Sequence, residues 1–403
     1  MPEARKYFRQ SLEVSQSVGD ERGQARALEA LGDAYYLQSK YSKAEQSYIQ
    51  ARNIFSQLGS QVAFAQLINS LGDVYRMRNE YSKSEESYIQ ARDIFSQIGD
   101  QVGFAQSVHR LGDIYRMRYE YSKAEESYIQ AHNIFSHTGD QVGFAQVTKS
   151  LGDVYCMRDE YSKAEASYVQ ARDIYSQSGN QLGFAQALKS LGDVYRVRSE
   201  YSKAEESFTQ ARDIYSQIGV QLGFAQSLKS LAEVYRMRNE HSKAEESFIQ
   251  ARNLYSQLED QLGFAQSVAG LGDVYRMRNE YSQAEEWYIQ ARDIFSRIGD
   301  QLGFANSIQG LGRVYAARGE YAKAKESYLE AQQVYRQIGD MSASANILWY
   351  LGSLHYQQAQ YREAERLIRE ASTIYAEVGL EHDVAECGAL LDQIRLSNEI
   401  WST

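Results

Sequence analysis

The chain has 403 residues with 53 acidic and 43 basic side chains, and its net charge of −10 disfavours nucleic acid or an anionic membrane as a general partner. Its two cysteines, Cys156 and Cys387, lie far apart in sequence, which indicates a reduced intracellular protein without a disulfide framework. The single proline, Pro2, favours an all-helical chain, since proline breaks helix interiors.

Near-copies of one 40-residue segment follow one another along the chain. The copy at 111–150 reads LGDIYRMRYEYSKAEESYIQAHNIFSHTGDQVGFAQVTKS. Leu-Gly opens most copies, but Ala232 replaces the glycine in the copy that begins at Leu231. A fixed period between 20 and 50 residues is typical of stacked repeat proteins. Each repeat then packs on its neighbours, and the whole array forms one long domain.

The repeat divides the chain into three parts. Residues 1–20 align with the second half of a repeat, so we expect the second helix of a truncated first repeat and a chain that is a fragment of a longer protein. Residues 21–380 contain nine units of 40 residues, each predicted to be a helix pair. Residues 381–403 predict a capping helix and a tail, in which we expect Trp401 to be partly exposed.

Two apolar periodicities near 3.6 residues predict two helices in each unit, within 100–118 and 122–136 in the copy described above. Asp100 is predicted to cap the first helix at its N-terminus. Gly139 stands where the end of the second helix favours a left-handed residue.

Local sequence also predicts how the pair begins and packs. Ser122, followed three residues later by Glu125, predicts a capping box at the start of the second helix. Gly112 lies inside a helix, where glycine costs about 1 kcal/mol relative to alanine. Its recurrence predicts a close helix crossing, with Ala124 as the facing small side chain.

Leu111-Gly112 with Tyr115, and then Ala124 with Tyr128, resemble the tetratricopeptide repeat. The chain departs from that pattern in having no opening tryptophan, no closing proline, and 40 residues where the family has about 34. Its long units are similar to those of spindle-orientation adaptors and kinesin light chains, and to the repeat arrays of fungal NTPase-type receptors. The resemblance implies an all-α, right-handed superhelical solenoid of stacked antiparallel helix pairs, whose first helices line a concave groove.

The first helices carry polar residues at recurring positions, which we call the polar strip. It contains an amide row, an acidic row, a basic row, and two positions that vary between copies. The amide row is Gln66, Gln106, Gln146, Gln186, Gln226, Gln266, Asn306 and Asn346; the acidic row is Asp33, Asp73, Asp113, Asp153, Asp193, Glu233 and Asp273; the basic row is Arg76, Arg116, Arg196, Arg236 and Arg276; and the variable positions include Lys149, Lys189, Lys229, Trp349 and Tyr350.

Two interpretations of the polar strip are open. Asp113 and Arg116 are three residues apart, so such residues can pair along each helix and simply keep the groove hydrated. Alternatively, the strip holds a peptide, with arginines binding its carboxylates and amides binding its backbone. The acidic row favours a ligand of mixed charge, or an Arg or Lys side chain, whereas the basic row favours carboxylates. We therefore expect a protein or peptide ligand of mixed or acidic charge.

Catalysis has no candidate residues. The six histidines fall at different repeat positions, and no glycine-rich phosphate loop is present, so we expect no enzyme activity, cofactor or metal. The polar N-terminus and the lack of a long apolar run predict a soluble cytoplasmic protein that binds neither nucleic acid nor membrane. The predicted function is a non-enzymatic protein-interaction scaffold. The alternatives are the sensor region of a larger NTPase-type receptor and a self-associating structural spacer.

Overall fold

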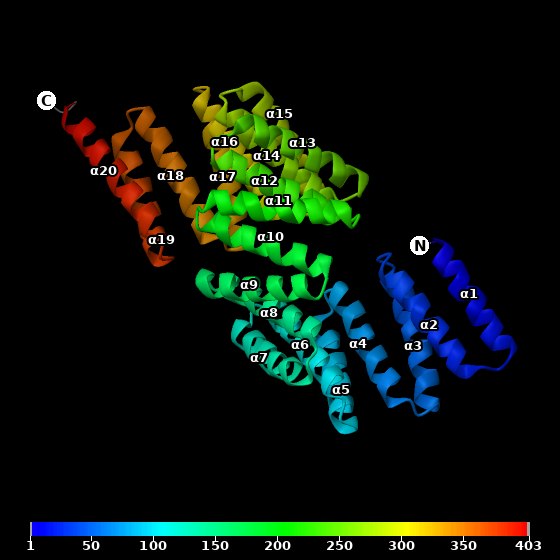
Figure 1. Cartoon of the computed structure of the whole chain (residues 1–403). Coiled ribbons are helices and arrows are strands. Elements are labelled where there is room, and N and C mark those ends of the chain that lie inside the picture. Colours follow the sequence, from blue (N-terminus) through cyan, green and yellow to red (C-terminus); the bar gives the residue numbers. More distant parts are fainter. Residues whose placement is uncertain (1, 401–403) are drawn as a thin grey trace. The chain divides into compact units, whose positions relative to one another are not determined.

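The computed structural model describes residues 2–400, and these residues form α-helices joined by short turns (Figure 1). The predicted all-α class and the predicted helix pairs are confirmed. The tail at 401–403, including Trp401, lies outside the described residues. The helices are α1 (Pro2–Ser17), α2 (Glu21–Tyr36), α3 (Tyr41–Gln57), α4 (Gln61–Met77), α5 (Tyr81–Ile98), α6 (Gln101–Met117), α7 (Tyr121–Thr138), α8 (Gln141–Met157), α9 (Tyr161–Gln177), α10 (Gln181–Val197), α11 (Tyr201–Gln217), α12 (Gln221–Met237), α13 (His241–Gln257), α14 (Gln261–Met277), α15 (Tyr281–Ile298), α16 (Gln301–Ala317), α17 (Tyr321–Ile338), α18 (Met341–Gln357), α19 (Tyr361–Glu377) and α20 (Glu381–Ile400).

The chain forms two compact units that divide after Arg198. Within each unit, every helix packs on the next helix along the chain, as α6 packs on α7 and α14 on α15. The even-numbered helices are the first helices of the repeats, and neighbouring first helices such as α6 and α8 also touch. The polar strip therefore lies on consecutive, adjacent helices within each unit.

Several helix boundaries have a local cause. The Asp100 carboxylate accepts a hydrogen bond from the backbone N–H of Gly103 at 2.9 Å, which confirms it as the N-cap of α6. Gly139 has a φ of 76° and ends α7, as predicted. The predicted capping box on α7 is wrong. That helix begins at Tyr121, so Ser122 lies inside it, and Glu125 instead accepts a bond from Arg158 of the next repeat at 2.6 Å.

Gly112 makes room for an aromatic ring. A methyl group added to Gly112 would lie 2.5 Å from Cε1 of Tyr128, a fully buried residue of α7. The nearest neighbour of the glycine is therefore this ring, whereas the sequence predicted Ala124.

In the copy that carries Ala232 in place of the glycine, the corresponding ring is Phe248. Space for the Phe248 ring lies at Gly270 on the next first helix, where an added methyl would be 2.4 Å from its Cζ.

A ladder of ion pairs joins successive repeats at the turn between the paired helices. The guanidinium of Arg118 binds Glu85 at 2.5 Å, and that of Arg278 binds Glu245 at 2.6 Å. Equivalent pairs are Arg78–Glu45, Arg158–Glu125, Arg198–Glu165, Arg238–Glu205 and Arg318–Glu285.

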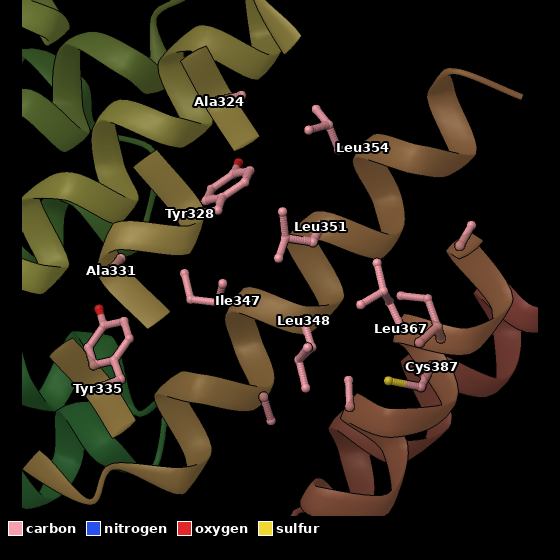
Figure 2. Close-up of a cluster of buried hydrophobic side chains, with 14 of the residues drawn as sticks. Ala324, Tyr328, Ala331, Tyr335, Ile347, Leu348, Leu351, Leu354, Leu367 and Cys387 are labelled. Carbon is pink, nitrogen blue, oxygen red and sulfur yellow. The ribbon is translucent and has the colours of Figure 1, made fainter. Parts of the chain in front are cut away.

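The apolar core continues between the repeats into the last helices. Figure 2 shows Tyr328 and Tyr335 of α17 beside Ile347 and Leu351 of α18, with Cys387 of α20 on the far side of α18. Most of these side chains are almost fully buried. In this part of the chain the core thus continues from one repeat to the next.

We expect Gly152→Ala to destabilise the chain, although alanine favours helix by about 1 kcal/mol. Its methyl group would lie 2.7 Å from Cε1 of Tyr168, and overpacking of this kind costs about 1–3 kcal/mol. The measurement is the urea midpoint of unfolding. Adding Tyr168→Phe and Ser190→Gly, which copies the arrangement around Ala232, should restore part of the loss. A higher midpoint for the single variant would contradict this packing.

Candidate interaction strip

The acidic row of the polar strip is bonded to the scaffold. The hydroxyl of the buried Tyr128 donates to Asp113 at 2.7 Å, from α7 to the preceding first helix. Burial raises the pKa of Tyr128, and the charge of Asp113 adds to this effect, so the hydroxyl remains a donor. The same bond joins Tyr48 to Asp33, Tyr88 to Asp73, Tyr168 to Asp153, and Tyr288 to Asp273.

Two copies have phenylalanine in place of this tyrosine. Fifteen residues after Glu233 the chain carries Phe248, which has no hydroxyl, and Glu233 is instead bound by Arg236 at 2.6 Å. Asp193, in the other such copy, is bound by Lys189 at 3.2 Å and lies 3.8 Å from Arg196. The carboxylate therefore keeps a partner where the hydroxyl is missing.

Most cations of the polar strip are neutralised locally. The predicted pairing of Arg116 with Asp113 is confirmed at 3.7 Å, and the Arg276 guanidinium lies 3.5 Å from the Asp273 carboxylate. Lys149 binds Asp153 at 3.1 Å. The strip therefore has far less free positive charge than its sequence suggests.

The amide row divides into bonded and free members. Asn306 and Asn346 accept hydrogen bonds from the hydroxyls of Tyr335 and Tyr375, at 2.6 and 2.8 Å. Gln266 accepts a hydrogen bond from Lys229 at 2.5 Å. Four exposed members on α4, α6, α8 and α10, and the partly exposed Gln226 on α12, make no side-chain hydrogen bond within residues 2–400. The exposed ones are Gln66, Gln106, Gln146 and Gln186.

An aromatic cluster occupies α16 to α18. Trp349 lies edge-on to Tyr350, with 5.3 Å between ring centroids, and Tyr350 stacks on Tyr328 at 5.4 Å. The Arg313 guanidinium lies over the Tyr350 ring, 5.5 Å from its centroid. Sequence reasoning selected Trp349 and Tyr350 but missed Arg313, although the break in the acidic row at this position is visible in the sequence.

The strip holds no constellation suited to chemistry. Burial raises the pKa of the Cys156 thiol, the opposite of what a reactive thiolate needs. Among the described residues, no three His, Cys, Asp or Glu side chains gather as metal ligands. None of the described helices is long and apolar enough to cross a membrane.

Comparisons with known proteins agree with this architecture. The profile of the family described as Tetratricopeptide repeat matches residues 1–57 and 143–217, and that of Soluble NSF attachment protein matches residues 224–381. A search of curated protein sequences gives no match.

Solved structures share the fold at low identity. The apo form of RapI is 14% identical, covers 88% of this chain and 98% of its own, and has a TM-score of 0.67. A STAND protein with a tetratricopeptide repeat sensor from Pyrococcus horikoshii is 14% identical, with a TM-score of 0.61 over 86% of this chain and 55% of its own. A Rap protein complexed with competence and sporulation factor is 16% identical, with a TM-score of 0.54 over 82% of this chain and 97% of its own. The helix pairs, their buried tyrosines and these matches show helical repeats of the tetratricopeptide type, stacked as a solenoid.

Proposed function

We propose that the chain is a non-enzymatic, intracellular scaffold that binds a peptide or protein segment along the polar strip. The observation that carries this proposal is the set of exposed, unbonded amides Gln106, Gln146 and Gln186. They lie on α6, α8 and α10, and these neighbouring first helices are in contact. Each amide has both donors and an acceptor, which is what a peptide backbone requires. A row of such groups can therefore hold an extended segment in place.

Local charge pairing supports the same assignment. Because Asp113 pairs with Arg116, and Lys149 with Asp153, the neighbouring charges add little net field along the amide row. Hydrogen bonds from the amides then contribute more of the specificity than long-range attraction does. The Rap protein complexed with competence and sporulation factor shows that a similar fold can hold a ligand, which supports a binding role here.

A second candidate is a sensor role inside a larger NTPase-type protein. The likeness to the STAND protein with a tetratricopeptide repeat sensor supports it. Both candidates need a ligand surface, and the polar strip is that surface in either case. Reading the genomic frame upstream of residue 1 separates them, because the sensor role requires an encoded nucleotide-binding domain.

Replacing Gln106, Gln146 and Gln186 together by alanine should weaken peptide binding roughly tenfold or more, since each hydrogen bond contributes about 0.5–1.5 kcal/mol. The probes are dodecapeptides selected on the whole chain from a random phage-displayed library, and fluorescence polarisation gives the dissociation constants. The matched control replaces Gln90, Gln130 and Gln170, which are exposed on α5, α7 and α9, the second helices that come directly before α6, α8 and α10. Failure to select any peptide, or equal losses in both variants, would sink the proposal.

Replacing Asp113 by alanine should lower stability while leaving the affinity for the selected peptides within about twofold. The variant leaves the buried Tyr128 hydroxyl without its acceptor, which costs about 1–3 kcal/mol. Urea unfolding of Asp113→Ala, Tyr128→Phe and the double variant measures the coupling between the two residues. Unchanged stability together with lost peptide binding would show that Asp113 contacts the ligand instead.

A further inference from the structure

We propose that Arg313, Trp349 and Tyr350 form a subsite for an acidic side chain, Asp or Glu, that is followed by an apolar residue in the bound segment. This inference rests on the proposed binding function and names the chemistry of the partner. The subsite lies on α16 and α18, within the second compact unit.

The first argument is charge. Arg313 occupies the position where earlier copies carry Asp or Glu, for example Asp273, so the sign of the acidic row reverses there. Neither α16 nor α18 contains an acidic residue within its bounds. Whereas Arg276 and Lys149 have carboxylate partners, Arg313 makes no ion pair with any described residue. This cation is available to a ligand.

The second argument is geometry. The Arg313 guanidinium lies over the Tyr350 ring, and that ring is itself stacked on the buried Tyr328, with 11° between the planes. This cation–π contact holds the guanidinium against the ring, and a guanidinium without a carboxylate partner can bind a carboxylate at two points. The arginine is therefore oriented before a ligand arrives, which lowers the entropic cost of binding.

The third argument concerns the surface beside the cation. Trp349 and Tyr350 are only partly buried, and their rings meet edge to face. Aromatic side chains in this setting are the residues that dominate binding energy at interfaces. An apolar side chain next to the ligand carboxylate would pack on them.

Two polar groups of α18 also lack a partner. The indole Nε1 of Trp349 and the hydroxyl of Ser353 are buried without a hydrogen-bond partner among residues 2–400. They lie four residues apart, on the same side of the helix. Both groups can donate a hydrogen bond, and they lie on the helix that carries Tyr350.

The test uses the phage-selected dodecapeptides, synthesised with amidated C-termini and measured against the whole chain. We expect the selection to enrich Asp or Glu followed by an apolar residue. Replacing that acid by its amide should weaken binding about 10- to 100-fold, as expected for loss of a charge-assisted pair. Binding of the acidic peptide should weaken as salt is raised.

The informative variant is Arg313→Asp, which restores the residue that other copies carry opposite their tyrosine and so offers the Tyr328 hydroxyl the same kind of acceptor. On this variant the acidic peptide and its amide counterpart should bind equally. The matched control is Lys325→Glu, which makes the same change in charge at an exposed position of α17 and restores the glutamate found there in other copies. It should preserve the preference for the acidic peptide.

The outcomes separate this inference from the function on which it rests. Selected peptides that lack an acid, or an acid preference that survives Arg313→Asp, overturn the subsite and leave the scaffold function standing. If the peptides bind only with a free C-terminal carboxylate, the subsite recognises a chain terminus and not an Asp or Glu side chain, and this inference is wrong. A selection that yields no binding peptide overturns both proposals.

Discussion

The hydrogen bond from a buried tyrosine to an aspartate on the preceding first helix, as from Tyr128 to Asp113, links the fold to the candidate binding surface. The tyrosine ring needs the space left by Gly112, and its hydroxyl needs an acceptor, because a buried donor without one is costly. The acceptor lies on the face that otherwise looks suited to a ligand. This hydrogen bond therefore fixes the packing of the helix pair. It also gives the carboxylates of the acidic row a partner within the protein.

The sequence was sufficient to predict the repeat, the helix pairs and caps such as Asp100, because period and local capping are short-range properties. The sequence was insufficient to predict which side chains of different helices contact each other. The role of Gly112 depends on which side chain of α7 turns toward it, and Glu125 contacts Arg158 in the next repeat rather than capping its own helix. The sequence left open whether the acidic row pairs within the scaffold or binds a ligand for the same reason, since its tyrosine partners lie fifteen residues away on another helix.

Local pairing also changes which residues count as functional candidates. Charged residues dominate the sequence pattern, yet Arg116 and Lys149 have carboxylate partners in their own helices. What stays available is less conspicuous in sequence: exposed glutamines such as Gln146, and Arg313, at a position where other copies are acidic. Departures from the repeat are therefore better guides to recognition here than the repeated residues themselves.

The space around Phe248 bears on how such an array can be recombined. Its ring fits because Gly270, on the following first helix, leaves the room that Ala232 takes away. If a single 40-residue copy were moved to another place in the array, the Phe248 ring would lose the space that Gly270 provides in the next copy. The interchangeable module is therefore a longer window that extends from one first helix through the next, and gene duplications or engineered arrays should preserve stability best when they respect that boundary.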